Sequence, residues 1–192
     1  MDKSQYNLCI AVIKAFAKQG LLNDIILVGS WCVPLYKNYF QSSEYRSTIL
    51  TRDVDFLIHS PDKITVKVDV PDELMKLGFI KDASYTTGGK AITKLLHPDL
   101  IIEFLVPLYG RGNEISHYLK NLSISAQKVR FLDFLLTSTI AIKIEDIKIS
   151  LPHPAYFAIH KFLTALRRDK ANKAEKAPHT TRRNIFYDIA FD

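Results

Sequence analysis

The chain of 192 residues is 47% apolar and 24% charged, and its formal net charge is +6. This length and composition are typical of a soluble domain with one full hydrophobic core and room for a small second lobe. The longest charge-free apolar run near the start, residues 25–36, is too short to cross a bilayer, and charges interrupt any signal-type segment in residues 1–22. We therefore expect a cytoplasmic protein with no membrane association, and we leave its oligomeric state open.

Apolar spacing predicts alternating helices and strands in the first part of the chain. The expected helices are residues 4–19, 30–40 and 71–77, and the expected strands are residues 24–29, 53–58, 64–70, 79–85, 91–97 and 101–106. Ser4 can cap the first helix, and Pro34 fits only in the first turn of the second. Gly88 and Gly89 are expected to form the hairpin turn between the fourth and fifth strands.

Beyond Pro107 the pattern changes. It predicts a helix over residues 113–122, strand material over residues 131–151 and an amphipathic helix over residues 155–168. The order of elements indicates an α/β (α+β) fold, in which a mixed sheet carries helices mainly on one face and a helical extension follows at the C-terminus.

We expect the chain to divide into a core over residues 1–110 and an extension over residues 111–192 that ends in a basic tail. Residues 167–183 hold seven Lys or Arg against two acids, a local charge of +5, so the rest of the chain is nearly neutral. Such a segment suits a polyanion, either RNA or a triphosphate, and it suits a solvated helix end equally well. RNA binding through this segment is therefore a hypothesis with an open alternative.

The two cysteines, Cys9 and Cys32, both lie in apolar stretches. Cysteines in such stretches are typical of buried free thiols, so we expect no disulfide and infer a reducing compartment. The six histidines include no pair four residues apart, so they do not form the helical metal-binding motif.

Three acidic residues interrupt strands that are otherwise apolar. Asp53 and Asp55 are two apart on one predicted strand, so their side chains project from the same face, about 6.5–7 Å apart. Leu57 makes that face apolar beyond them, and Glu103 lies within another predicted strand. Carboxylates beside an apolar wall need a cation, and their hard oxygen atoms favour Mg²⁺ or Mn²⁺. Taken alone, two aspartates with this spacing on a strand are more often a solvent-facing pattern than a metal site, and Glu103 alone is also explained as an edge residue.

Gly29 and Ser30 follow the first predicted strand and precede a short predicted helix. A glycine allows the backbone to approach a ligand closely, and the start of a helix offers free N–H groups to a phosphate. The Ser30 hydroxyl adds one more donor. The next residue, Trp31, is expected to anchor the helix in the core.

Gly29-Ser30, Asp53-Val54-Asp55 and Glu103 together resemble the hallmark of the nucleotidyltransferase superfamily with the DNA polymerase β-like fold. In that superfamily, an apolar strand leads into a Gly-Ser turn, a second strand carries the two aspartates, and a later strand carries the third acid.

The long gap between the Gly-Ser turn and the aspartates resembles a bacterial subfamily related to abortive-infection-type nucleotidyltransferase toxins. Arg46 and Thr51 match the Arg and Thr of that subfamily, and Lys161 matches a lysine on a later helix. The resemblance implies three catalytic and metal-binding residues, Asp53, Asp55 and Glu103. It also implies four nucleotide-binding residues, Gly29, Ser30, Thr51 and Lys161. For Lys161, a plain surface lysine is the open alternative.

Two classes of function follow from the resemblance. The first is an enzyme that uses Mg²⁺ or Mn²⁺ to transfer a nucleoside monophosphate from a nucleoside triphosphate to a hydroxyl of RNA, protein or a small molecule, releasing pyrophosphate. The second is an inactive module of the same fold that binds nucleotide, RNA or a protein partner. A phosphotransferase on the same scaffold is a third hypothesis. The three acids favour the enzyme, whereas residues 178–192 do not match the family's pattern and favour the module.

Overall fold

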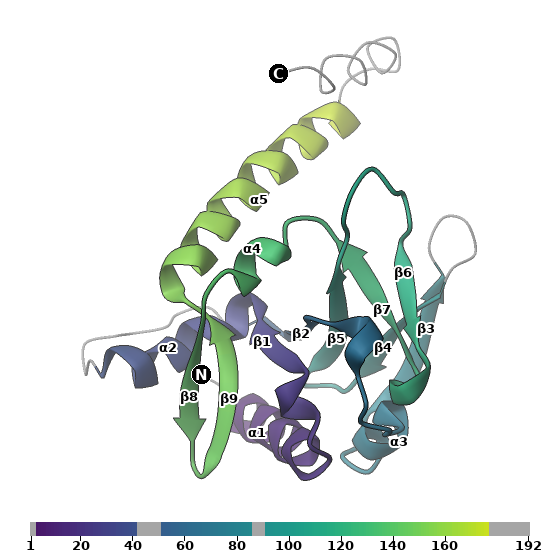
Figure 1. Cartoon of the computed structure of the whole chain (residues 1–192), viewed down its shortest axis with the longest axis vertical. Helices are drawn as coiled ribbons and strands as arrows, with labels where there is room; N and C mark the ends of the chain where they lie inside the picture. The colour runs from purple at the N-terminus through teal and green to yellow at the C-terminus, as the bar shows by residue number, and fades with distance from the viewer. Residues whose placement is uncertain (1–2, 42–50, 86–90, 177–192) are drawn as a thin grey trace.

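The structure is a computed structural model that describes residues 3–41, 51–85 and 91–176, with backbone alone for residues 83–85 and 166–176. In chain order the helices and strands are α1 (Lys3–Lys18), β1 (Ile25–Val28), α2 (Cys32–Phe40), β2 (Asp53–Ile58), α3 (Val70–Met75), β3 (Ile80–Tyr85), β4 (Ala91–Leu96), β5 (Ile101–Pro107), β6 (Ser116–Leu119), β7 (Ile124–Val129), α4 (Asp133–Leu136), β8 (Thr139–Ile144), β9 (Ile147–Pro152) and α5 (Pro154–Lys176) (Figure 1). Short 3-10 turns cover Leu21–Asn23, Gly29–Trp31, Pro61–Lys63 and Lys120–Leu122.

Seven of the strands form one mixed sheet in the order β1-β2-β5-β4-β3, with β7 paired to β5 and β6 paired to β7. The β2–β5 and β5–β7 pairs are parallel, and the other pairs are antiparallel. Strands β8 and β9 form a separate antiparallel hairpin. This mixed α+β architecture confirms the expected fold class. The expected division at residue 110 stays a prediction, although β6 and β7 extend the same sheet.

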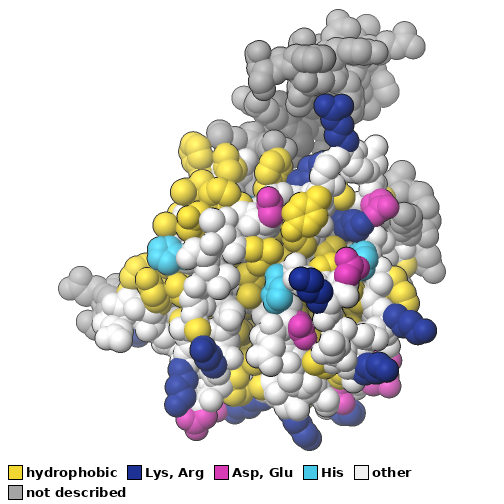
Figure 2. Space-filling model, in the orientation of Figure 1, with side chains coloured by type: hydrophobic (Ala, Val, Ile, Leu, Met, Phe, Trp, Pro, Cys, Tyr) yellow, Lys and Arg dark blue, Asp and Glu magenta, His cyan; other side chains and the backbone are white. Residues whose placement is uncertain are grey.

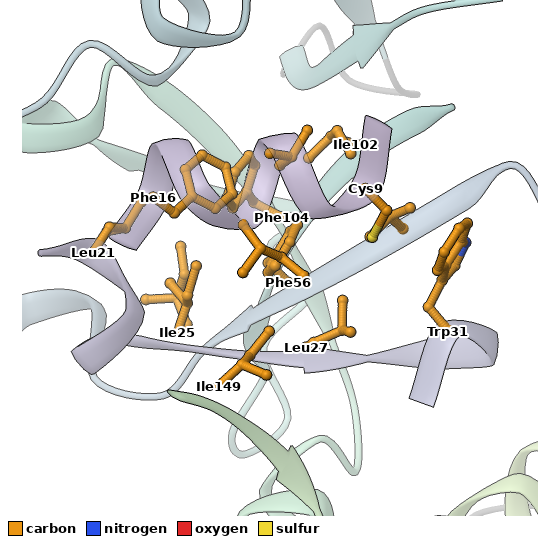
Figure 3. Packing of buried hydrophobic residues seen from close by; sticks show 14 of the residues in the cluster. Cys9, Phe16, Leu21, Ile25, Leu27, Trp31, Phe56, Ile102, Phe104 and Ile149 are labelled. Atoms are coloured by element: carbon orange, nitrogen blue, oxygen red, sulfur yellow. The ribbon is translucent and has the colours of Figure 1, made fainter. Parts of the chain in front are cut away.

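The main hydrophobic core lies between one face of the sheet and helices α1, α2 and α3. Phe16 of α1 packs edge-on against Phe56 of β2 at a centroid distance of 5.1 Å, and Phe56 stacks on Phe104 of β5 at 5.9 Å (Figure 3). All three rings are fully buried. Burying a side chain of this size contributes about 1.5–3 kcal/mol, so this core fixes β2 and β5 side by side.

The β8–β9 hairpin packs beside β1 and extends the core, where Ile149 faces Leu27 (Figure 3). The Tyr36 hydroxyl of α2 donates a 2.9 Å hydrogen bond to the Pro152 carbonyl at the end of the hairpin. Helix α5 begins directly afterwards and is held by Phe157, whose ring packs edge-on against Tyr36 at 5.7 Å.

Beyond this anchor α5 extends away from the sheets (Figure 1). Its side chains Ile159, Phe162 and Leu163 are exposed, and Figure 2 shows apolar side chains gathered over the region of α4 and α5. Within the described residues, no helix is both long enough and apolar enough to span a membrane.

The strand predicted over residues 64–70 is wrong. Residues 64–69 form no strand, and Val70 begins α3. The Asn121 side chain donates to the Ile64 carbonyl, and the Val68 N–H donates to the Asn121 carbonyl, so the backbone of this segment is bonded to a turn instead of a strand. The alternating apolar residues still pack against the core, because Ile64 and Val70 are buried.

The helix predicted over residues 113–122 is also wrong. Residues 116–119 form β6, which pairs with β7 over residues 124–129, a strand that apolar spacing did not predict. Ser123 takes a left-handed conformation (φ +57°) and closes the turn between them. Pairing between the two segments therefore overrides the local helical spacing.

Within residues 131–151 the expected strand material begins with a short helix, α4, and only the later part forms β8 and β9. The alternating isoleucines of that later part behave as expected, because Ile142, Ile144 and Ile149 are buried. Cys9 and Cys32 are both free and buried, as predicted. Burial raises the pKa of the Cys9 thiol to about 12, so this group is protonated and unreactive at neutral pH.

Candidate active site

The sheet register places the acids of β2 and β5 on one face. Asp55 is the direct partner of Glu103 in the parallel β2–β5 pair, so the two side chains project from the same side. Asp53 shares this face because it lies two residues before Asp55. The intervening residues Val54 and Phe56 point to the opposite face and are fully buried in the main core.

Beyond the carboxylates this face becomes apolar, as the sequence predicts. Leu57 and Leu105 are the next paired residues along β2 and β5. They belong to a second hydrophobic cluster, in which Leu57 packs with Leu132 and Leu135 from the region of α4. The acids therefore lie at the border of a dry wall, where a charged group is stabilised only by a nearby opposite charge.

Gly29 lies directly against the Asp55 carboxylate. A Cβ atom at Gly29 would overlap Asp55 Oδ2 and would lie 3.3 Å from its Cγ. Gly29 also has a positive φ of 77°, which disfavours other residues. Two independent constraints thus require glycine at the end of β1.

The turn after Gly29 binds the segment that leads into β2. The hydroxyls of Ser30 and Thr51 share a hydrogen bond of 2.5 Å, and Thr51 Oγ1 donates to the Asp53 carbonyl at 3.3 Å. The indole N–H of Trp31 donates to the Thr51 carbonyl at 3.0 Å. Trp31 is only 1% exposed, so it anchors this turn in the core as predicted.

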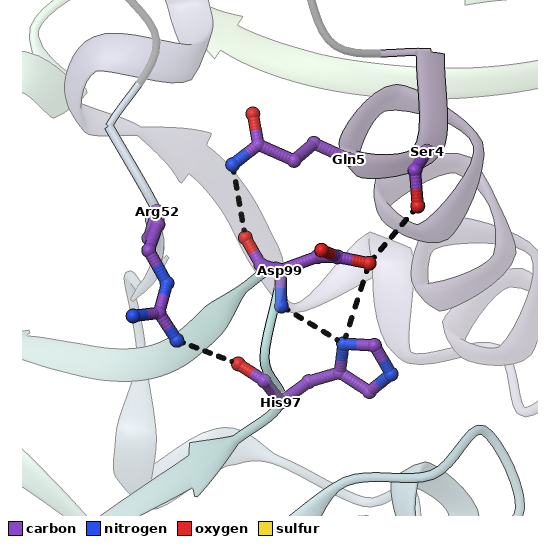
Figure 4. Close-up of polar contacts among 5 residues, drawn as sticks. All are labelled: Ser4, Gln5, Arg52, His97 and Asp99. Atoms are coloured by element: carbon purple, nitrogen blue, oxygen red, sulfur yellow. Dashed lines mark hydrogen bonds and ion pairs between the residues drawn. The ribbon is translucent and has the colours of Figure 1, made fainter.

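The start of β2 is also fixed from the other side (Figure 4). Arg52, which precedes Asp53, donates from Nη2 to the His97 carbonyl at 2.9 Å. The backbone N–H of Asp99 donates to His97 Nδ1 at 3.1 Å, and the Asp99 carboxylate accepts a 2.9 Å hydrogen bond from Ser4 of α1. These contacts hold the β4–β5 connection, and hence Glu103, in register with the aspartates.

The Asp55 carboxyl group is the most perturbed acid of the site. Its pKa is raised to about 6, mainly by burial and also by the negative charges of Glu103 and Asp53. Lys161 and Lys94 act in the opposite direction. Burial and the neighbouring negative charges both disfavour the ionised form of Asp55, and a bound cation would favour that form.

Glu103 has a partner that sequence reasoning missed. Lys94 of β4 lies opposite Glu103 in the antiparallel β4–β5 pair, and its Nζ is 2.6 Å from Glu103 Oε1. The signal was present in the sequence, because a hairpin closed between Leu96 and Ile101 pairs residue 94 with residue 103. It could be recognised only once the length of that turn was known.

Lys161 lies on α5 with its Nζ 5.3 Å from the centroid of the Phe157 ring. Its positive charge lowers the pKa of Asp55. Its role in nucleotide binding stays a prediction. Arg46 lies outside the described residues, and so do the side chains of the basic residues in 167–183.

The donor chemistry of Asp53, Asp55 and Glu103 fits a hard divalent cation, since all three offer carboxylate oxygens on one face. Their side chains are not close enough together to form a metal site as they stand. The described residues contain no group of three His, Cys, Asp or Glu side chains that could hold a metal ion. Glu103 is instead ion-paired with Lys94. Metal ligation by these residues therefore stays a prediction.

A pocket of about 350 Å³ lies away from the acids, beyond the ends of β2 and β5. His59, Lys63, Tyr109 and His117 are among its lining residues, and none of the three acids is. The expected cleft between residues 29–55 and the helix of Lys161 stays a prediction.

A comparison with known families matches the chain over residues 7–180 to a model described as nucleotidyltransferase. No curated protein and no solved structure matches it. The matched region includes nearly the whole chain and every candidate catalytic, metal-binding and nucleotide-binding residue named above. The chain therefore belongs to the nucleotidyltransferase family.

Proposed function

We propose that the protein is a metal-dependent nucleotidyltransferase that moves a nucleoside monophosphate from a nucleoside triphosphate to a hydroxyl group. The acceptor hydroxyl belongs to RNA, a protein or a small molecule. One observation carries the proposal: Asp55 is paired with Glu103 on the neighbouring strand and lies against Gly29, the residue that follows β1. This arrangement brings acidic side chains next to a backbone that a phosphate group can approach closely.

Asp53, Asp55 and Glu103 would hold Mg²⁺ or Mn²⁺ through their carboxylate oxygens. When bound, the cation supplies positive charge to the triphosphate oxygens, on which negative charge develops during transfer. The apolar wall formed by Leu57 and Leu105 lies next to the carboxylates and limits access of water from that side.

The remaining residues position the nucleotide. The Gly29 backbone admits the phosphates, and the Ser30 hydroxyl is held by Thr51 beside it. Lys161 supplies a positive charge from α5. We assign all four residues to binding the triphosphate part of the substrate.

The transfer is a single displacement at the α-phosphorus. The acceptor oxygen forms a bond to this atom while the bond to the bridging oxygen of the β-phosphate breaks. Pyrophosphate leaves with the bonding electron pair, and the proton of the acceptor hydroxyl passes to the Glu103 carboxylate.

The experiment that tests this proposal uses each α-³²P-labelled nucleoside triphosphate with Mg²⁺ and total RNA or protein. The expected result is a labelled macromolecule, or a labelled small product, with release of pyrophosphate. Asp55→Asn should abolish the label, whereas Asp146→Asn, at the turn of the β8–β9 hairpin, should not. Binding of a nucleoside triphosphate with no product from any acceptor would favour the inactive module.

A further inference from the structure

Lys94 lies in a row of charged residues that crosses the sheet. Asp55 of β2 pairs with Glu103 of β5, and Glu103 pairs with Lys94 of β4. Cross-strand partners have their Cβ atoms about 4.5–5.5 Å apart, so each side chain can reach the next. Lys94 uses this position to form the 2.6 Å ion pair with Glu103 Oε1.

This ion pair differs from a surface pair in its surroundings. The Glu103 side chain is 15% exposed and that of Lys94 is 35% exposed, whereas in the Lys143–Asp146 pair of the β8–β9 hairpin both side chains are largely exposed. Partly buried charges interact more strongly than exposed ones, because less water screens them. Lys94 therefore has a substantial effect on the charge that Glu103 presents.

Lys94 also acts on the other two acids. Its ammonium group interacts electrostatically with Asp53 and Asp55 as well as with Glu103. The other lysine that lowers the pKa of Asp55, Lys161, comes from α5 and contacts the ring of Phe157. Lys94 is thus the lysine that a strand of the same sheet places directly on one of the three carboxylates.

We propose that Lys94 is a built-in counter-ion that competes with a divalent cation for Glu103. Without the cation, its ammonium group neutralises Glu103 and reduces repulsion among the three carboxylates. When the cation binds, Glu103 is shared with it or released to it, so Lys94 sets how tightly the site binds metal. This inference rests on the proposed metal site of Asp53, Asp55 and Glu103. Lys94 is a positioning residue, because it acts through Glu103.

The competing explanation is that the Lys94–Glu103 pair only stabilises the β4–β5 hairpin. The two explanations predict opposite effects on metal binding. A structural pair, once removed, leaves metal affinity unchanged or weaker because the hairpin loosens. A counter-ion, once removed, leaves three carboxylates with more negative charge, so metal affinity increases.

The experiment measures metal binding and thermal unfolding of the full chain, with the wild type compared with Lys94→Met, Lys94→Arg and the control Lys143→Met. Terbium luminescence reports metal affinity, and melting temperatures are recorded in EDTA and in MgCl₂. Lys94→Met should bind terbium at least about threefold more tightly, melt at a lower temperature in EDTA and gain more from MgCl₂ than the wild type. Lys94→Arg keeps the charge and should resemble the wild type, as should Lys143→Met.

Unchanged or weaker terbium affinity in Lys94→Met would overturn the inference. If Lys94→Met does not fold, Lys94→Gln replaces it, with the same expected direction. Asp55→Asn separates this failure from failure of the proposed function. If the wild type binds metal and Asp55→Asn does not, the metal site stands whatever Lys94 does. If neither the wild type nor the Lys94 variants bind metal, both proposals are rejected.

Discussion

Asp55 and Gly29 are fitted to each other across the antiparallel β1–β2 pair. The carboxylate of Asp55 occupies the space in which a Cβ atom at position 29 would lie. Asp55 pairs in register with Val28, so the turn that begins at Gly29 starts directly beside the carboxylate. Gly29 and Asp55 are 26 positions apart in the sequence, but in the structure they are in direct contact.

Gly29→Ala should therefore destabilise the fold by more than the strain of its positive φ alone would cause. Gly20 is a matched control, because its φ is +74° and nothing lies within 4 Å of a Cβ placed there. Gly20→Ala should cost about 1–2 kcal/mol through the left-handed conformation. Gly29→Ala should cost at least about 1 kcal/mol more, since the Asp55 carboxylate must also move. Urea unfolding measures both variants, and equal losses would show that the contact carries no energy.

The raised pKa of Asp55 makes the metal-free protein less stable as pH rises. The folded value of about 6 lies above the ordinary value of 3.8, so the folded state holds this proton more tightly than the unfolded chain does. The resulting loss of stability is absent below the ordinary pKa, develops as pH rises toward 6 and is complete above it. Its upper limit is about 3 kcal/mol.

Asp55→Asn should remove this part of the pH dependence and should stabilise the metal-free protein at pH 7.5. Unfolding free energies of both proteins in EDTA between pH 4.5 and 7.5 test the expectation. The difference between the variant and the wild type should grow as pH rises toward the folded pKa of about 6 and level off above it. A difference that stays constant would contradict the assigned pKa.

Lys161 should act on the nucleotide and not on the fold. Its side chain contacts Phe157 at the surface of α5, so Lys161→Met should leave the melting temperature nearly unchanged. The loss of the positive charge that lowers the pKa of Asp55 should weaken binding of a nucleoside triphosphate by about tenfold. Isothermal titration measures the affinity, with Lys148→Met on the β8–β9 hairpin as the control. Equal affinities for both variants would assign Lys161 to the solvent-exposed surface.

The core strands of the site could be predicted from sequence because local pattern and burial agree there. Strand β2 spans Asp53–Ile58 as predicted, since apolar residues alternate with the acids and the face of Val54, Phe56 and Ile58 is buried throughout. β-Branched residues and the Gly-Ser turn likewise marked β1. The same physical chemistry that defines these elements also places the two aspartates on one face.

Other parts could not be predicted because their conformation depends on distant partners. Residues 64–69 alternate like a strand, but their backbone bonds to Asn121, which lies more than fifty residues further along the chain. Residues 116–119 have helical spacing, but they pair with β7. Nothing in the sequence distinguishes Lys94 from the other lysines, and its pairing with Glu103 depends on the register of β4 and β5. The spacing of apolar residues does not determine this register.

If the basic segment 167–183 recruits RNA, binding should weaken steeply with salt. Each phosphate neutralised on a single strand contributes a logarithmic slope of about −0.7, so four contacts predict a slope of about −3. Neutralising Arg167, Arg168, Lys170 and Lys173 together should flatten the slope and leave nucleoside triphosphate binding much less affected. The matched control neutralises four lysines elsewhere on the surface: Lys14, Lys76, Lys143 and Lys148.

Fluorescence anisotropy with a labelled single-stranded RNA, titrated with KCl, measures the slopes of the three proteins. A flat slope only in the variant of the basic segment would assign RNA binding to this segment. An equal change in the control would indicate nonspecific attraction to net charge. If the wild type has no affinity for RNA even at low ionic strength, the acceptor is a protein or small-molecule hydroxyl, because the polyanion that the segment was expected to bind is then excluded.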